Sequence, residues 1–493
     1  MSLPIVVIGS GPSGAVAAHT LIQRGIPVVM LESGDTLPSG ILLRVNGRTI
    51  LRRRPKVNPR GATHVTGRNP NTQWWVHLDP GGLTNLWTGA VPRFSPEDFT
   101  EGEQLDTRYR WPVDYEELVP FYERIEKMMS ISGGHRETPM APQGVFRYEQ
   151  PLPRGWQAVD RAAQARGQAL LSVPIANGAP WMFARQGTAF NSFTCLVVPL
   201  LQSPLFELRT GAHVLRLELD ATQQRVGGVV YQDRASGQQH RISVAGAIIA
   251  CGPLNSTKLL FDSACAAFPE GLGNREGVLG HYLHDHPHEW FSLELSKPIS
   301  RLDHCIYLTR RPFGYPPLMA SGITLGAASV LERVLSHTPL PGRKIGVQIM
   351  GSMVPTEDNF ALPDRQKIDD FGMPAIRVCI DFDKDVKDNM SLARKNLREV
   401  LEDAGYESRM IHEPNVLCPG SSVHFAGTVR MHNSPVYGML DRYNRLHAVP
   451  NVLVTDASCF TTCPEKKPTL TMMALSCRAA ERLADDLKRG TCV

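Results

Sequence analysis

The 493-residue chain lacks long hydrophobic runs, CxxC pairs and any strong excess of charge. No apolar stretch approaches the roughly 20 residues needed to cross a bilayer, so we expect no membrane span. The short apolar run at residues 5–8 has no basic segment before it, which argues against a secretory signal peptide. We therefore expect a cytoplasmic protein whose 10 cysteines are reduced thiols.

The charge balance excludes one broad class of partner. A formal net charge of +4 is small for this length and gives no general reason to expect nucleic-acid binding. The length suits two or three domains, and the 42% hydrophobic fraction supports a large core. One segment, 40–60, is locally basic, and a solvated loop explains it better than a polyanionic partner. Its charges are Arg44, Arg48, Arg52, Arg53, Arg54, Lys56 and Arg60.

The first thirty-odd residues carry the clearest motif. Residues 5–8 form an apolar, β-branched run that predicts a buried parallel strand, and a GxGxxG turn follows at 9–14. Residues 15–24 have helical composition, and 26–31 predict a second strand that ends at an acid. Such a turn accepts a diphosphate at the helix start, and the acid binds the ribose. The pattern predicts a dinucleotide site, for NAD or FAD, made by Gly9, Gly11, Pro12, Ser13, Gly14, Glu32 and Ser33.

A second glycine-rich stretch spans residues 81–89, shortly after Trp74 and Trp75. Paired glycines followed by small polar residues suit a backbone that passes close to a flat ligand or a diphosphate. Its tryptophan could stack on a sugar or flavin, although core packing explains such residues equally well. The candidate ligand-binding residues here are Gly82, Thr84, Asn85, Trp87 and Thr88.

Segment 81–94 resembles the glucose–methanol–choline (GMC) flavin oxidoreductases, and within them the pyranose oxidase-like branch. The resemblance rests on the Gly-Gly-x-Thr-x-x-Trp-Thr pattern followed by Pro-Arg-Phe at 92–94. Pyranose oxidases carry a histidine in this segment that bonds covalently to the flavin, and Leu86 stands at the matching position here. The resemblance therefore implies FAD held without a covalent link.

The middle of the chain extends the resemblance. Residues 206–249 return to strand patterning, and an apolar strand at 247–250 runs into a glycine turn and a helix. This is similar to a second flavoprotein signature. It implies that the backbone near Val214 contacts adenine and that Ala250, Cys251 and Gly252 lie against the nucleotide.

Four histidines fall within residues 281–288. On an extended segment, His284, His286 and His288 would share one face, so a metal site must be considered. The segment resembles the family's Asp-His-Pro turn, where no metal is bound, and we expect no metal here.

The strongest chemical motif is residues 423–431, which resemble the family's His-x-x-Gly-Thr-x-Arg-Met segment. The resemblance implies that His424 is the catalytic base, since a neutral imidazole suits removal of an alcohol proton. A strand at 452–455 and a helix from Pro468 to 487 return the chain to the cofactor, which adds Asp456, Ala457, Pro468 and Thr469 as candidate contacts.

One position departs from the family. The second catalytic residue, His or Asn, is expected just before the last helix, and Lys467 stands there instead. If its ammonium faces His424, it would lower the pKa of the imidazole and stabilise a forming alkoxide. If it turns outward, the second catalytic role is vacant.

The resemblance implies an α/β fold in two discontinuous parts. Residues 1–100, 205–290 and 420–493 would form a Rossmann-like FAD-binding domain. Residues 101–204 and 291–419 would form an α+β substrate domain built on an antiparallel sheet.

The predicted function is FAD-dependent oxidation of a secondary alcohol of a sugar or glycoside, with hydride transfer to flavin N5 and oxygen or a quinone as electron acceptor. Three alternatives stay open. They are a non-sugar alcohol such as a sterol or choline, a lyase that keeps FAD without redox chemistry, and a flavin-binding partner subunit. The sequence does not give the oligomeric state and allows a homo-oligomer.

Overall fold

The computed structural model describes residues 3–35, 78–177, 190–310, 317–329, 340–415 and 417–490, positions 331 and 335, and the backbone of three short strands before residue 66. The side chains of the basic segment 40–60, together with Trp74 and Trp75, lie outside the described residues.

A six-stranded sheet carries the nucleotide motif. Its order is β21-β22-β13-β1-β2-β9, and all neighbours are parallel except the edge strand β21. Every residue of β1 and β2 is buried, as expected for a parallel sheet covered on both faces. The strands are β1 (Ile5–Ile8), β2 (Val28–Glu32), β9 (Phe206–Thr210), β13 (Gly246–Ile249), β21 (Arg445–Leu446) and β22 (Val449–Val454).

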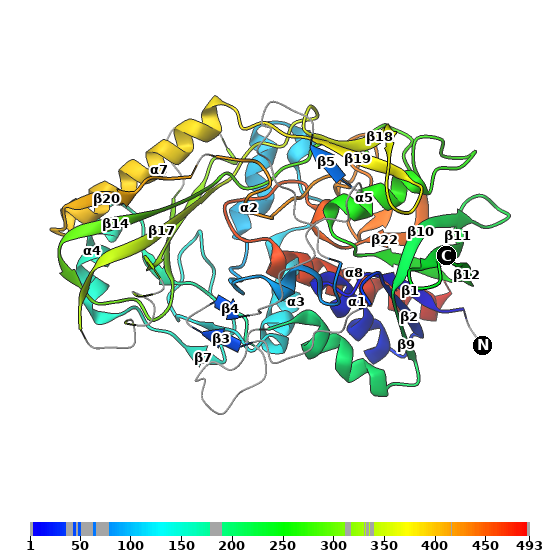
Figure 1. Cartoon of the computed structure of the whole chain (residues 1–493), viewed down its shortest axis with the longest axis horizontal. Coiled ribbons are helices and arrows are strands. Elements are labelled where there is room, and N and C mark those ends of the chain that lie inside the picture. The colour runs from blue at the N-terminus through cyan, green and yellow to red at the C-terminus, as the bar shows by residue number, and fades with distance from the viewer. Residues whose placement is uncertain are drawn as a thin grey trace.

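Helices from distant parts of the chain pack together beside this sheet (Figure 1). The last helix, α8 (Thr469–Arg489), contacts both α1 (Pro12–Gln23) and α3 (Tyr115–Met128). The apolar face of α3 belongs to the same core as the sheet, although its residues fall in the predicted substrate domain. The predicted domain boundaries stay a prediction.

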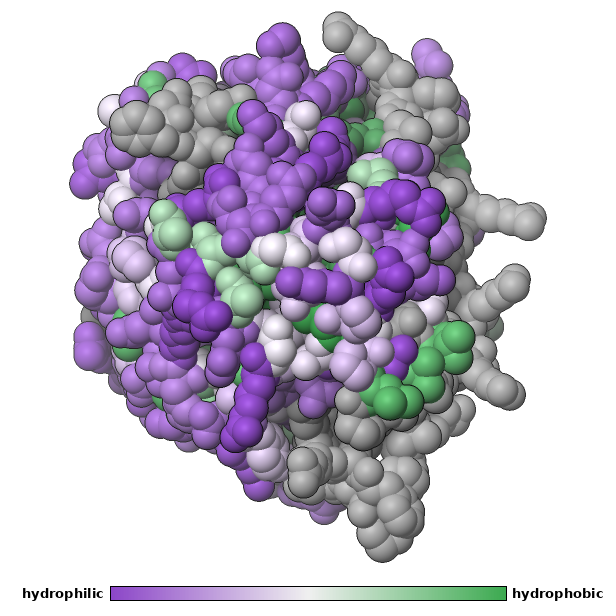
Figure 2. Space-filling view, turned by 90° about the vertical axis from the view of Figure 1, so that its left-hand side faces the viewer, coloured by the Kyte–Doolittle hydropathy of each residue, from purple (hydrophilic) through white to green (hydrophobic). Residues whose placement is uncertain are grey.

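A second six-stranded sheet is wholly antiparallel, with the order β20-β14-β17-β16-β15-β8. The long helix α7 (Lys384–Asp403) covers it, and α4 (Gln157–Gln164) packs against α7. Figure 2 views the molecule from this end, where the surface is mostly hydrophilic. The strands are β8 (Leu170–Ser172), β14 (His288–Ile299), β15 (Ile306–Arg310), β16 (Ser321–Ala327), β17 (Gly342–Gly351) and β20 (Ser408–His412).

Smaller elements complete the fold. A three-stranded meander contains β10 (Ala212–Leu219), β11 (Val226–Asp233) and β12 (Gln239–Ser243), and a second small sheet contains β18 (Phe360–Ile368), β19 (Pro374–Cys379) and β5 (Thr63–Val65). The remaining pairs are β3 (Leu43–Val45) with β4 (Arg48–Ile50) and β6 (Ser132–Gly133) with β7 (Tyr148–Glu149). Two further helices are α2 (Pro96–Thr100) and α5 (Pro253–Asp262).

Short 3-10 or π turns lie at Gly82–Asn85, Glu101–Gln104, Thr107–Tyr109, Arg154–Trp156, Phe193–Val197, Val198–Gln202 and Ala457–Cys459. The predicted α/β class, with one parallel and one antiparallel sheet, is confirmed. Within the described ranges, no helix combines the length and apolar character that a membrane crossing needs.

Candidate active site

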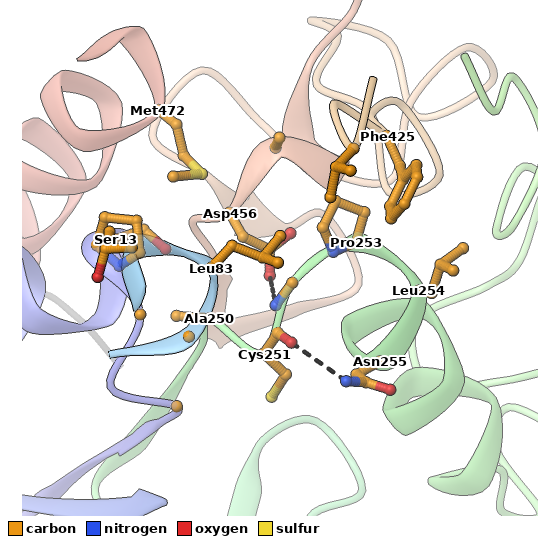
Figure 3. Close-up of a pocket in the computed structure, with 18 of the residues that line it drawn as sticks. Ser13, Leu83, Ala250, Cys251, Pro253, Leu254, Asn255, Phe425, Asp456 and Met472 are labelled. Atoms are coloured by element: carbon orange, nitrogen blue, oxygen red, sulfur yellow. Dashed lines mark hydrogen bonds between the residues drawn. The ribbon is translucent and has the colours of Figure 1, made fainter. Parts of the chain in front are cut away.

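One cavity of about 660 Å³ extends from the carboxyl end of the parallel sheet to the antiparallel sheet. Its lining includes the turn after β1 at one end and residues of β14 and β17 at the other. Ligands in open α/β sheets bind outside the carboxyl ends of the strands, so this is the expected place for a nucleotide. Figure 3 shows part of the lining, where segments from the two ends of the chain meet the turn before α5.

The turn after β1 has the geometry that its glycines predict. Gly9 has φ +99°, and a Cβ on Gly14 would lie 2.1 Å from the carbonyl oxygen of Gly9. At Gly11, by contrast, no atom of the described chain lies within 4 Å of an added Cβ. The backbone is therefore open on the cavity side while α1 begins directly after it, at Pro12. These residues fit a diphosphate held by the free N–H groups of the helix start.

Glu32, the last residue of β2, lines the cavity. Its carboxylate accepts hydrogen bonds from the Ser10 amide at 2.9 Å, the Ser10 hydroxyl at 2.6 Å and the Gly34 amide at 2.7 Å. Burial raises the pKa of Glu32, and the same hydrogen bonds oppose that rise. The carboxylate is thus held in a fixed position where a ribose would lie.

The structure adds a residue at this end that the sequence did not single out. His213 lines the cavity beside the predicted Val214, and its Nδ1 lies 3.0 Å from the hydroxyl of Ser33. The imidazole stacks on Phe371 at 3.6 Å between ring centroids. Burial lowers the pKa of His213 to about 4, so the ring is neutral near pH 7.

Asp456 connects two strand-to-helix turns in the middle of the cavity. Its carboxylate accepts a hydrogen bond from the Gly252 amide at 3.1 Å, drawn in Figure 3, and another from the Ser256 hydroxyl. The adjoining predicted residues Ala250, Cys251 and Ala457 also line the cavity. The turn before α5 and the turn after β22 are therefore fixed to one another at the cavity wall.

Most of the predicted residues of the second glycine-rich stretch line the cavity, and one is buried behind it. Gly82, Thr84, Trp87 and Thr88 line the cavity, as predicted for contacts to a ligand. Asn85 does not, because its side chain is buried in hydrogen bonds to Pro80 and Asn191. Gly14, the other predicted residue outside the lining, serves the close contact between α1 and the turn.

His424 lies at the far end of the cavity with Lys467, Pro468 and Thr469. The Nδ1 atom of His424 lies 3.0 Å from Nδ1 of His286, and its backbone amide donates to Asp285 at 3.0 Å. Asp285 also accepts from the Gly420 amide at 2.7 Å. The carboxylate therefore fixes the backbone of the loop, and the second imidazole fixes the ring.

Burial lowers the pKa values of both basic side chains at this part of the cavity. Burial lowers the pKa of His424 well below its usual 6.5, and the nearby His286 and Lys467 lower it further. Burial also lowers the pKa of Lys467 to about 8. Lys467 lines the cavity together with His424 rather than turning outward, and at neutral pH it is a cation while the imidazole is neutral.

The remaining histidines of 281–288 do not converge. His284 bonds the carbonyl oxygen of Tyr282 at 2.9 Å, while His288 lines the cavity and contacts the side chain of Gln348 at 2.9 Å. In the part of the chain that the structure describes, no group of three His, Cys, Asp or Glu residues could hold a metal ion.

Sequence comparison gives the class of the protein. Two sequence models described as GMC oxidoreductase match residues 90–288 and 365–476. The chain belongs to the GMC oxidoreductase family and is an FAD-dependent enzyme that acts on CH–OH groups.

Individual relatives cover nearly the whole chain. Paromamine 6'-oxidase of Streptomyces fradiae is 28% identical over 98% of this chain and 91% of its own length. 2-Methyl-1,2-propanediol dehydrogenase of Mycolicibacterium austroafricanum is 26% identical over 97% and 95%, and pyranose 2-oxidase of Lyophyllum shimeji is 20% identical over 99% and 92%. The solved structure of pyridoxine 4-oxidase from Mesorbium loti has the same fold, with a TM-score of 0.68, 17% identity and 99% of each chain covered.

Proposed function

We propose that the protein oxidises a hydroxyl group of a sugar or glycoside, with His424 as the base. The observation that carries this proposal is that one cavity is lined both by the glycine turn after β1 and by His424 and Lys467. Relatives named for a pyranose and for paromamine support a sugar-like substrate. A secondary ring hydroxyl is the expected site of attack, and this stays a prediction.

The chain's own groups have distinct roles in this proposal. Neutral His424 accepts the hydroxyl proton of the substrate. The lowered pKa of its ring keeps the imidazole unprotonated and its lone pair available near neutral pH. The Lys467 ammonium stabilises the negative charge that develops on the substrate oxygen. Bound FAD supplies the hydride acceptor for the carbon-bound hydrogen.

We propose that FAD is held without a covalent bond. Leu86 lines the cavity at the position where the resemblance places a flavin-linked histidine, and a leucine side chain has no atom that could form such a link. Precipitating the protein with acid should release all yellow colour into the supernatant. Colour retained in the pellet would contradict this proposal.

A second substrate class has a specific observation in its favour. The dehydrogenase named for 2-methyl-1,2-propanediol is more similar to this chain than the pyranose oxidase is, at 26% against 20% identity. A small diol is therefore the competing substrate for the same chemistry.

Anaerobic stopped-flow mixing tests both. The purified FAD enzyme is mixed with sugars, glycosides and small diols, and bleaching of the flavin absorbance is followed. Bleaching by a sugar or glycoside, lost in His424→Gln with FAD content unchanged, is the expected result. Bleaching by diols alone would select the competing class, and a product formed while the flavin stays oxidised would indicate a lyase. Reoxidation by air or by a quinone then identifies the acceptor.

A further inference from the structure

A buried histidine, His286, lies in contact with the ring of His424. His286 is 1% exposed, lies outside the cavity lining, and has both ring nitrogens in contact with neighbours. Its Nδ1 faces Nδ1 of His424 at 3.0 Å, and its Nε2 faces the carbonyl oxygen of Pro464. The two contacts together constrain where the protons of both rings lie.

The carbonyl oxygen of Pro464 determines which nitrogen of the His286 ring carries the proton. A carbonyl only accepts hydrogen bonds, so Nε2 of His286 must carry the proton in this contact. The Cys463 sulfur lies 3.5 Å from the same nitrogen, but a bare Nε2 would set its lone pair against that of the carbonyl oxygen. The proton therefore stays on Nε2.

The charge state of His286 determines which nitrogen of the His424 ring carries the proton. Burial lowers its pKa to about 4, with Lys467 and His288 adding to the effect, so the ring carries one proton near neutral pH. With that proton on Nε2, Nδ1 is a bare acceptor. The contact at 3.0 Å then requires His424 to donate from its own Nδ1.

We propose that His286 is a positioning residue that holds His424 in the tautomer protonated on Nδ1, so that Nε2 keeps a free lone pair for the substrate proton. The proposal rests on the proposed function of His424 as base. In this arrangement Nε2 of His286 donates a hydrogen bond to Pro464, and Nδ1 of His424 donates one to Nδ1 of His286. The only proton transferred is that of the substrate hydroxyl, which moves to Nε2 of His424. The loop before α8, residues 463–467, thereby orients the base through its backbone as well as presenting Lys467.

Two amide variants separate the two contacts of His286. In His286→Asn the amide oxygen lies where Nδ1 was and can still accept from His424. In His286→Gln the amide reaches the Nε2 position, so the contact to Pro464 is kept and the acceptor for His424 is lost. A merely structural role would make the variants equally harmful.

Kinetics give the first measurement. We expect flavin reduction in His286→Gln to slow by about 10–100-fold, the size typical of losing a partner that orients a functional histidine. His286→Asn should remain within about threefold of the parent rate, and the dissociation constant of the substrate should be unchanged in both because His286 does not line the cavity. Equal losses in the two variants, or no loss in His286→Gln, would overturn the proposal.

Spectroscopy gives a measurement that needs no substrate. Solid-state ¹⁵N NMR of the FAD enzyme labelled only at histidine distinguishes the two neutral tautomers, and subtraction of the His424→Gln spectrum assigns His424 among the 16 histidines. A protonated Nδ1 with a bare Nε2 supports the proposal, and the reverse overturns it even if the His286 variants do not fold. If His424 has the expected tautomer but the enzyme oxidises no alcohol, the proposed function is rejected and the inference about the tautomer stands.

Discussion

Lys467 is the residue on which the chemistry departs most from the family pattern. It lines the cavity, and burial lowers its pKa to about 8. Its charge is therefore present below pH 8 and is lost as the pH rises through that value. The pKa of His424 lies well below 6.5, because the ring is buried beside other basic groups, so the imidazole is neutral near pH 7.

These two pKa values predict the pH profile of flavin reduction. The rate constant should be near its maximum at pH 7 and should fall to about half of it near pH 8, because Lys467 then loses the charge that stabilises the developing alkoxide. We expect Lys467→Asn to fold, to react more slowly at pH 7 and to lack the fall above pH 8. Lys395→Met, on an exposed part of α7, is the control. An unfolded Lys467→Asn, or one that keeps the alkaline fall, would reject this role.

The contacts that the sequence did not predict were missed for a physical reason. The motif around His424 and the departure at Lys467 are local patterns, so both could be read directly. His286 meets His424 across 138 positions of chain, and His213 meets Phe371 across a similar span. No periodicity or spacing encodes such contacts, because they depend on how separate loops pack.

The turn between β1 and α1 combines two glycines with opposite surroundings. An added Cβ at Gly14 would collide with the Gly9 carbonyl at 2.1 Å, while one at Gly11 meets nothing in the described chain and points into open space. Gly11 has φ −60°, which alanine adopts without strain.

The pair predicts a separation of folding from cofactor binding. Gly11→Ala should keep the stability of the FAD-free protein within about 0.5 kcal/mol and weaken FAD binding by tenfold or more. Gly14→Ala should lower the stability of the FAD-free protein itself, because the helix must move away from the turn. Urea unfolding of the stripped proteins and fluorescence titration with FAD measure the two effects. Unchanged FAD affinity in Gly11→Ala would contradict a diphosphate at this turn.

The segment before α8 is held by a buried ionic cluster. The Lys466 ammonium lies 2.8 Å from Asp98 and 3.0 Å from Glu465, and all three side chains are about 1% exposed or less. Asp98 also accepts from the Ser95 amide at 2.6 Å, at the start of α2. The cluster therefore joins the loop that carries Lys467 to a distant helix.

Removing the cation of this cluster should be costly. Lys466→Met leaves two buried carboxylates without their main counter-charge, and we expect a loss of about 3–5 kcal/mol in the free energy of unfolding. The exposed pair of Lys395 and Glu399 provides the matched control, where Lys395→Met should change stability by less than about 0.5 kcal/mol. Urea denaturation of both variants decides this, and similar losses in the two would show that the cluster is not a main support of the loop.

At the scale of the whole molecule, the cavity is bounded by both six-stranded sheets. Its lining includes Ile8 and Glu32 of the parallel sheet and His288 and Gln348 of the antiparallel sheet. A ligand that fills it contacts both and binds the folded state alone. The stabilisation then follows from mass action.

FAD should therefore raise the melting temperature of the whole protein in a single step. At 100 times its dissociation constant, the cofactor adds about 2.7 kcal/mol. Riboflavin, which lacks the diphosphate, should give little shift. Calorimetry of the stripped protein with each ligand tests this, and two separate transitions of which only one responds to FAD would show that the sheets unfold independently.

The elements were more predictable than their arrangement. The strand at 5–8, the helix after the glycine turn and the last helix follow from pattern and composition, and each appears within a few residues. The packing of α3 on α8 could not be predicted, because an amphipathic pattern shows that one face of a helix is buried without showing which element covers it.

The central strands of the parallel sheet leave the ribosome in an order that differs from their order in the sheet. β1 leaves the ribosome first, its neighbour β13 comes more than two hundred residues later, and β22 pairs with β13 after two hundred more. Strand β22, the loop that bears Lys467 and helix α8 follow the other elements of the described residues. A nascent chain thus has no finished flavin pocket until β22, the loop with Lys467 and α8 have been made, so capture of the cofactor must follow the synthesis of these segments.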